Sequence, residues 1–396
     1  MNKSLFSLAI GGFAIGLTEF VIMGMLPDVA SDLSISITQA GSLISMYALG
    51  VVIGAPILAG GTSRFRPNLV IIVMMTAFAF ANFLSVISPN FEFLLVSRFF
   101  SGLPHGAFFG VGAVVASRLA PKGKQASAVA AMFSGLTIAN VIGVPLGTYI
   151  GHHFSWRITF ALVALIGMTC AISAKFWIPQ LEGIKSASFK KDLKIIKKPE
   201  LLLIVAITSI GTGGLFALLS YIAPFSINVS KLPESWMPYL MVIAGLGMTA
   251  GNMLGGKVAD RVAPRFAILI FLGSLVLILS GIYIFGENIY VLGGLVFAAT
   301  AAALALASPL QMLLIKNSKE AEMLGSSLGQ SSFNIGNALG AFLGGMPIAM
   351  GYGFQSSLLV GISLAGAGVL LSLLYIYTHH NSSKLQRTDS LAECNT

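Results

Sequence analysis

The sequence predicts an all-α membrane protein, with twelve transmembrane helices in two parallel, pseudo-symmetric six-helix halves. Three observations support this prediction: a very low charge content, twelve long apolar runs and an internal repeat. Of the 396 residues, 56% are hydrophobic and 9% are charged. Soluble globular proteins carry about 25% charged residues, so this chain has too little polar surface to face water. The composition excludes a soluble enzyme, a nucleic-acid-binding protein and a disordered chain.

Twelve apolar runs are each long enough to cross a bilayer core of about 30 Å, which takes about 20 helical residues. The predicted spans cover residues 5–27, 39–62, 68–88, 91–117, 125–150, 155–178, 201–225, 236–256, 266–285, 288–315, 324–349 and 354–378. A basic cytoplasmic linker, residues 179–200, joins the N-terminal half (1–178) to the C-terminal half (201–378). Residues 379–396 are predicted to form a polar, disordered cytoplasmic tail.

The basic residues indicate which side of the membrane each loop faces. The net charge is +9, from 23 Lys+Arg and 14 Asp+Glu. With the N-terminus inside, all but three of the 23 cations fall in cytoplasmic segments, the exceptions being Arg98, Arg157 and Lys231. This bias follows the positive-inside rule. It predicts a multi-pass protein of the cell (cytoplasmic or inner) membrane with both termini in the cytoplasm, and it requires no nucleic-acid partner.

The two halves repeat each other at an offset of 197 residues. Without gaps, this shift matches the following residues: Gly16 with Gly213, Pro27 with Pro224, Gly50 with Gly247, Gly54 with Gly251, Arg64 with Arg261, Pro67 with Pro264, Lys122 with Lys319, Asn140 with Asn337, Gly143 with Gly340 and Gly147 with Gly344. The shift is almost half of the chain, so the halves have the same orientation. Transporters built this way bind their substrate between the halves, near the membrane midplane.

Loop motifs in both halves resemble those of the major facilitator superfamily. GAPILAGGTSRFRP (54–67) and GNMLGGKVADRVAP (251–264) resemble the superfamily's glycine-rich helix that ends in Asp-Arg. The resemblance implies a conformational latch on the cytoplasmic face. Its residues are Arg64, Asp260 and Arg261. In the first copy Ser63 takes the place of the acid, so we expect the latch to be weaker there.

Two further motifs extend the resemblance. RFFSGLPHGAFFG (98–110) resembles the superfamily's membrane-embedded arginine motif. NVIGVPLGT (140–148) resembles the helix-packing motif of its antiporters, carried here by Gly143, Pro145 and Gly147. In that second motif a valine and a threonine replace two glycines of its fullest form.

The combination of motifs resembles the arabinose-efflux-permease group, within the twelve-span drug:proton antiporter branch. TEF at residues 18–20 and WRITF at residues 156–160 complete this pattern. The resemblance covers nearly the whole chain. It implies the major facilitator fold and export of a small molecule in exchange for protons, and it leaves the substrate open.

Glu19 and Arg98 are the two plainly charged residues inside the predicted spans. An ionisable side chain at a helix centre costs about 2.5–3.5 kcal/mol on insertion scales. By the helical rise, both lie roughly 9–12 Å below the outer end of their spans. We predict that Glu19 exchanges a proton and that Arg98 regulates it. A static buried ion pair and recognition of a cationic substrate by Glu19 are the alternatives.

His105 lies two helical turns after Arg98 and on the same helix face. It is predicted either to relay protons or to be a satisfied histidine beside the kink at Pro104. Further polar residues are predicted to line the substrate cavity, or to join helices by hydrogen bonds. They are Asn140, Tyr221, Gln311, Gln330, Asn334 and Asn337.

The sequence shows no phosphate-binding loop, nucleophile elbow or metal-ligand spacing. We therefore expect no enzyme activity, no metal and no cofactor. The sequence predicts a secondary transporter that exports a drug-like compound or a sugar in exchange for protons by alternating access. It is surrounded by membrane lipids, and no obligatory protein partner is evident. The alternatives are a proton-independent facilitator or importer, and a non-transporting membrane sensor.

Overall fold

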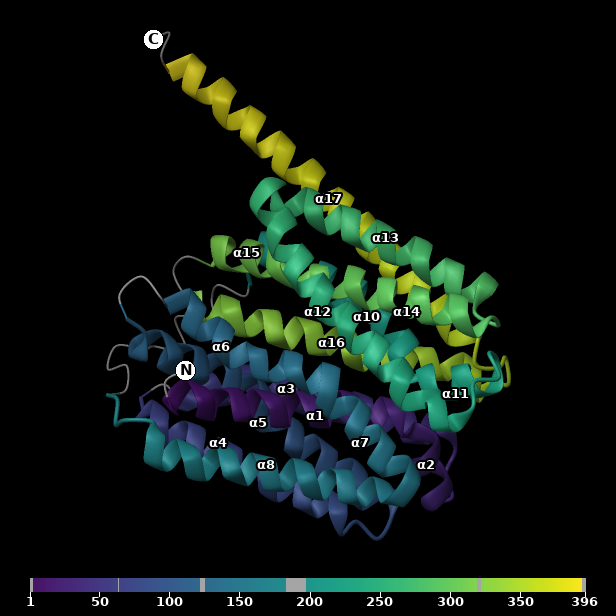
Figure 1. Ribbon diagram of the computed structural model, residues 1–396. Helices are drawn as coiled ribbons and strands as arrows, with labels where there is room; N and C mark the ends of the chain where they lie inside the picture. The colour runs from purple at the N-terminus through teal and green to yellow at the C-terminus, as the bar shows by residue number, and fades with distance from the viewer. Residues whose placement is uncertain (1–2, 63, 122–124, 183–196, 319–321, 394–396) are drawn as a thin grey trace.

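The computed structural model describes the chain except for residues 1–2, 63, 122–124, 183–196, 319–321 and 394–396. The described residues form helices and connecting turns, without a β-strand (Figure 1). Most of the predicted linker therefore lies outside the described residues. In Figure 1 the N-terminal half, in purple to teal, lies below the C-terminal half, in green to yellow.

Each half contains six membrane crossings, some of them broken into shorter helices. The N-terminal half contains α1 (Lys3–Gly24), α2 (Leu26–Asp32), α3 (Ile37–Thr62), α4 (Pro67–Val86), α5 (Phe91–Leu119), α6 (Gln125–Ile138), the π-helix η1 (Ala139–Gly143), α7 (Val144–Ile150), the π-helix η2 (Gly151–Ser155) and α8 (Trp156–Trp177). The C-terminal half contains α10 (Pro199–Ser220), α11 (Ile222–Asn228), the 3-10 helix η4 (Glu234–Trp236), α12 (Met237–Arg261), α13 (Pro264–Phe285), α14 (Ile289–Ala305), α15 (Ala307–Asn317), α16 (Glu322–Ala349) and α17 (Ser356–Glu393).

Ten helical segments of the described chain are long and apolar enough to cross a membrane. One of them, residues 128–177, makes two crossings, because the chain reverses at Ser155. The remaining crossing is α16, which has the length but is made less apolar by its serines and asparagines. These helices account for the twelve predicted spans.

Local signals in the sequence set many of the helix ends. The Asn90 side chain accepts a hydrogen bond from the Phe93 amide, and the Ser155 side chain accepts one from the Arg157 amide, so both are N-caps. At the other terminus α17 continues to Glu393, through the tail predicted to be disordered. The chain after Tyr377 contains no glycine or proline that would end the helix, and the extension projects beyond the bundle (Figure 1).

The internal repeat reappears in the packing of the helices. In α3, a Cβ on Gly54 would lie 2.1 Å from the Leu103 carbonyl oxygen of α5. In α12, a Cβ on the repeat-related Gly251 would lie 2.1 Å from the Ala301 carbonyl oxygen of α14. Both helix pairs thus approach closely through glycine, at a distance that any side chain would block.

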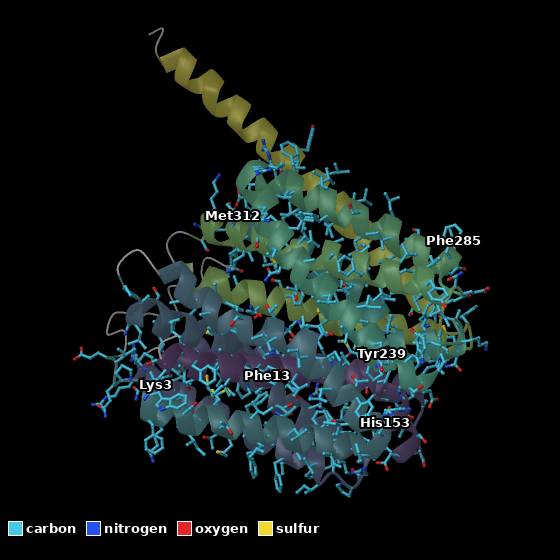
Figure 2. All side chains as sticks on the ribbon, in the orientation of Figure 1. Lys3, Phe13, His153, Tyr239, Phe285 and Met312 are labelled. Carbon is cyan, nitrogen blue, oxygen red and sulfur yellow. The ribbon has the colours of Figure 1, made fainter. Side chains whose placement is uncertain are left out.

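The halves meet along two repeat-related contacts, which we call the seam: α3 with α16, and α12 with η1 and α7. The Ser45 hydroxyl donates to the Ala338 carbonyl (3.2 Å), and a Cβ on Gly245 would lie 2.1 Å from the Asn140 carbonyl oxygen. Lys3 lies at one end of the bundle, the predicted cytoplasmic end, and His153 lies at the opposite, predicted outer end (Figure 2). Contacts of α12 with α6, toward the cytoplasmic end, are sparse, so the seam is tighter toward the outer end.

The glycine contacts predict a position-dependent loss of stability. Gly54→Ala pushes α3 away from the α5 backbone, which we expect to lower the free energy of unfolding by about 1–3 kcal/mol. Gly61→Ala, on the same helix with nothing within 4 Å of a new Cβ, serves as the matched control and should cause no loss, since alanine favours the helix. Thermal unfolding of the purified protein in detergent measures both. Equal melting temperatures for the two variants would contradict the packing assigned to Gly54.

Candidate functional site

Arg98 is held inside the N-terminal half by groups from four other helices. The side chain is fully buried in α5. Its guanidinium donates to the Thr18 hydroxyl (3.0 Å) and to the Thr18 carbonyl (3.2 Å). The Thr18 hydroxyl in turn donates to Asn82 Oδ1 (2.8 Å). The guanidinium carbon lies 4.3 Å from the centre of the Tyr47 ring and 5.4 Å from that of Phe160. Hydrogen bonds and cation–π contacts therefore stabilise the buried charge.

Glu19 follows Thr18 in α1 and reaches the seam. It is 3% exposed, and its carboxyl group lies beside Asn337 of α16, in the other half. Among the described residues, Glu19 Oε1 and both polar side-chain atoms of Asn337 have no hydrogen-bond partner. Glu19 is close enough to Arg98 for an electrostatic interaction. The two side chains are not among the ion pairs of the described chain, so this structure does not contain the static ion pair.

His105 lies deeper in α5 and contacts Tyr47 of α3. Its Nδ1 is 3.1 Å from the Tyr47 hydroxyl, and its ring packs edge-on against Phe109 with the centroids 5.5 Å apart. Tyr47 therefore touches both Arg98 and His105. Sequence reasoning missed Tyr47 because a lone tyrosine in an apolar span carries no charge that demands an explanation.

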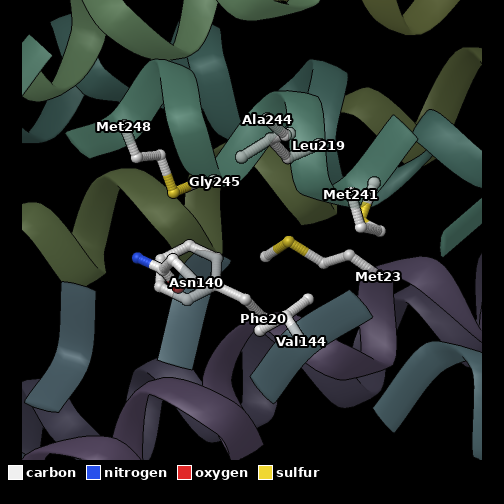
Figure 3. A pocket seen from close by; sticks show the side chains of 9 residues that line it. All are labelled: Phe20, Met23, Asn140, Val144, Leu219, Met241, Ala244, Gly245 and Met248. Atoms are coloured by element: carbon white, nitrogen blue, oxygen red, sulfur yellow. The ribbon is translucent and has the colours of Figure 1, made fainter. Parts of the chain in front are cut away.

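Asn140 lines an apolar pocket between the halves (Figure 3). It lies in η1, is 4% exposed, and its Oδ1 has no hydrogen-bond partner among the described residues. In Figure 3 Met23 of α1 faces Met241 of α12 across this pocket. The other residues that line it are Phe20, Val144, Leu219, Ala244, Gly245 and Met248.

The candidate cavity residues of α16 fall into two groups. Asn337 meets Glu19, as described above. Asn334 is buried and donates to the Gln330 carbonyl of its own helix (3.0 Å), while its Oδ1 has no partner in the described chain. Gln330 is half-buried, and Gln311 of α15 lies against the neighbouring Gly329. By the helical rise, Gln330 lies about 10 Å from Asn337 along α16, so Gln311 and Gln330 do not join the Glu19 group.

Tyr221, predicted to line the cavity or to join helices by a hydrogen bond, lies at the seam. It follows α10 directly, and its hydroxyl donates to the Ala341 carbonyl of α16 (2.7 Å). A Cβ on Gly41 of α3 would lie 2.5 Å from the same hydroxyl. Tyr221 is therefore packed between helices of both halves and is absent from the pocket of Figure 3.

The glycines of the helix-packing motif lie against α1. A Cβ on Gly143 would lie 2.8 Å from the Phe13 ring, and one on Gly147 would lie 2.7 Å from Val21. Pro145 lies in the first turn of α7, between these two glycines.

The predicted latch lies at the end of the bundle that is predicted to face the cytoplasm. Arg64 follows α3 and Arg261 ends α12, and both are exposed. The Asp260 side chain lies outside the described residues, so the latch stays a prediction.

Charged residues also connect the two halves at the outer end. His152 Nδ1 lies 3.0 Å from Asp28, and its Nε2 lies 3.8 Å from Glu234 in the other half. Burial raises the pKa of Asp28. Arg157 forms an ion pair with Asp32, and the hydrogen bond from Arg157 lowers the pKa of that carboxyl group. These contacts lie at the predicted outer end of the bundle, where Asp28, His152 and Glu234 also line a cavity between the halves.

The hydrogen bonds around Arg98 predict a large cost for Thr18→Val. This change leaves a guanidinium N–H and Asn82 Oδ1 without their partner, at about 1–3 kcal/mol of unfolding free energy. The control is Thr169→Val in α8, where an exposed threonine hydroxyl donates to a carbonyl of its own helix. Thermal unfolding in detergent should show a drop for Thr18→Val alone. If both variants melt like the wild type, Thr18 does not stabilise the buried arginine.

Comparisons with known proteins agree with this architecture. The chain is 39% identical over 378 residues to the putative transporter AraJ of Escherichia coli, covering 95% of both chains. It is 29% identical to a chloramphenicol resistance protein of Streptomyces lividans, covering 92% of this chain and 95% of the relative. It is 27% identical to a probable sugar efflux transporter of Pasteurella multocida, covering 98% and 96%.

Among solved structures, the fold is similar to that of a bacterial homologue of the human lysosomal transporter Spinster, in an inward-facing and occupied conformation. The TM-score is 0.77 at 16% identity, with 94% of this chain and 96% of the other covered. The family model of the Major Facilitator Superfamily matches residues 8–329. The chain therefore belongs to the Major Facilitator Superfamily.

Proposed function

We propose that the protein exports a small molecule from the cytoplasm in exchange for protons by alternating access. The observation that carries this proposal is the position of Glu19. Its carboxyl group is buried on the seam, has an oxygen without a hydrogen-bond partner and forms no ion pair in the described chain. Burial favours a neutral carboxyl group and a nearby cation favours a charged one. A change in the spacing of the halves can therefore take up or release a proton at Glu19.

The export direction is supported by the relatives and by the predicted topology. Two similar proteins are named for sugar efflux and for chloramphenicol resistance. The distribution of the basic residues supports a cytoplasmic location for both termini, and with them for the looser end of the seam. This arrangement gives a cytoplasmic substrate access to the space between the halves.

The side chains that line the pocket of Figure 3 support a substrate class, although the pocket must widen from this conformation, in which it has room for about one water molecule, to admit a substrate. Methionine, phenylalanine and leucine side chains line it, and Asn140 supplies one amide. Flexible methionine side chains adapt to differently shaped apolar molecules. We propose a predominantly apolar compound with few polar groups in preference to a free sugar.

Reconstitution into proteoliposomes tests the transport function in two steps. Counterflow of labelled sugars and lipophilic cations identifies a substrate and separates a carrier from a membrane sensor. An imposed pH gradient then separates an antiporter from a facilitator or importer. A carrier that ignores the pH gradient would contradict proton exchange and leave facilitated transport.

Glu19→Gln should abolish transport driven by the pH gradient and retain counterflow, because glutamine keeps the shape and polarity of the side chain without its proton. Glu92→Gln is the control, since it removes an exposed carboxylate from the outer start of α5. Substrate-induced proton flux measures the effect. Full proton dependence in Glu19→Gln would assign the coupling to another group.

A further inference from the structure

The Tyr47 side chain contacts the side chains of both Arg98 and His105. It is 1% exposed and comes from α3, the helix that forms the seam with α16. We infer that Tyr47 is a positioning residue: its hydroxyl fixes His105 as a neutral imidazole with the proton on Nε2, and its ring holds Arg98 against Thr18 and away from an ion pair with Glu19. The part of this inference that concerns Glu19 rests on the proposed function.

The hydrogen bond between Tyr47 and His105 has a preferred direction. A phenol O–H can donate or accept, and a neutral imidazole has one N–H and one acceptor nitrogen. Among the described protein atoms, the Tyr47 hydroxyl has no hydrogen-bond partner other than His105 Nδ1. Donation from Tyr47 to Nδ1 therefore satisfies the phenol proton. The guanidinium over the Tyr47 ring withdraws electron density from the phenol, which makes it a better donor.

The surroundings of His105 favour the neutral imidazole. It is 1% exposed, and no described carboxylate forms an ion pair with it. The titratable or charged groups near this cluster are Glu19 from α1, Arg98 from α5 itself and Tyr47 from α3. The other neighbours are uncharged: Phe109 from α5, Phe133 from α6, Phe160 from α8 and Asn337 from α16. A second positive charge beside Arg98 would be buried without a counter-ion.

The same contact restrains Arg98. The guanidinium lies over the Tyr47 ring at 4.3 Å while it donates to Thr18. His105 anchors the far end of the Tyr47 ring through the hydroxyl. With the ring fixed, Arg98 stays bound to Thr18, and the carboxyl group of Glu19 stays without an ion pair. His105 thus holds Tyr47 in place and takes no part in proton transfer.

Nuclear magnetic resonance of the imidazole nitrogens tests the first part without any transport assay. The full-length protein is labelled at histidine, reconstituted in lipid, and His105 is assigned by its loss in His105→Gln. We expect His105 to show Nε2–H with Nδ1 as acceptor, unchanged between about pH 5 and 8, the range in which an unperturbed histidine titrates. A wild-type His105 that carries its proton on Nδ1, or that titrates within this range, overturns this part.

Tyr47→Phe should remove the fixed tautomer of His105 while keeping an aromatic ring over Arg98. Tyr221→Phe is the matched control, since it removes a buried phenol that donates to a carbonyl; it should leave the His105 signals unchanged. Unchanged His105 signals in Tyr47→Phe would overturn the hydrogen bond as their cause.

Tyr47→Leu tests the second part, because it removes the ring that restrains Arg98. An ion pair between Arg98 and Glu19 then favours the charged carboxylate, so proton uptake requires more acid. We expect the pH profile of proton-coupled transport to shift to lower pH in Tyr47→Leu, and to shift less in Tyr47→Phe, which keeps the ring over Arg98 but loses its hydroxyl anchor. An unshifted profile in Tyr47→Leu overturns the restraint of Arg98. The histidine measurement is independent of transport, so its result for His105 holds even if the proposed function fails.

Discussion

The N-terminal half is organised around one constraint, the burial of the Arg98 guanidinium. An arginine inside a membrane protein keeps its charge and has five N–H donors. Its neighbours must therefore supply acceptors or aromatic faces from several directions. Here α1 contributes Thr18, α3 contributes Tyr47, α4 contributes Asn82 and α8 contributes Phe160. Four helices thus contribute groups to the surroundings of one buried charge, whose Nε has no hydrogen-bond partner in the described chain.

Buried polar atoms without a hydrogen-bond partner occur both inside the halves and at the seam. Within the N-terminal half, the Ser7 hydroxyl pairs with that of Ser173 at 2.8 Å, whereas Arg98 Nε and Thr148 Oγ1 have no partner in the described chain. At the seam, Glu19, Asn140 and Asn337 each have a buried atom without such a partner. Each such atom costs about 1–3 kcal/mol. At the seam this cost falls on the contact between the two halves and weakens it.

The sequence was sufficient to predict the arrangement of the helices. It was insufficient to predict which side chains contact each other in the candidate site. The length of the apolar runs, the asymmetry of the charges and the 197-residue repeat can all be recognised in the sequence itself, and the observed fold agrees with them. Whether Arg98 binds Glu19 or Thr18 depends on side-chain directions that differ by a few ångströms, which neither helical rise nor motif can resolve. The position of Tyr221 at the seam could not be predicted for the same reason. Tyr221 lies at the break between α10 and α11, and its ring lies against Gly41 of α3.

The internal repeat preserves the helices and the glycine contacts in both halves, whereas the titratable residues of the site occur in the N-terminal half. Shifted by 197 residues, Glu19 falls on Phe216, Arg98 on Leu295 and His105 on Ala302. Tyr47 falls in the same way on Ala244, which lines the pocket between the halves. The C-terminal half thus repeats the backbone and the glycine contacts without the titratable groups. A change of charge at the site arises in one half alone, and it reaches the other through the few polar residues at the seam, with Asn337 beside Glu19 as the direct contact. In the proposed proton exchange, a change of charge at Glu19 therefore acts directly on one half of a symmetric scaffold and on the other half through Asn337.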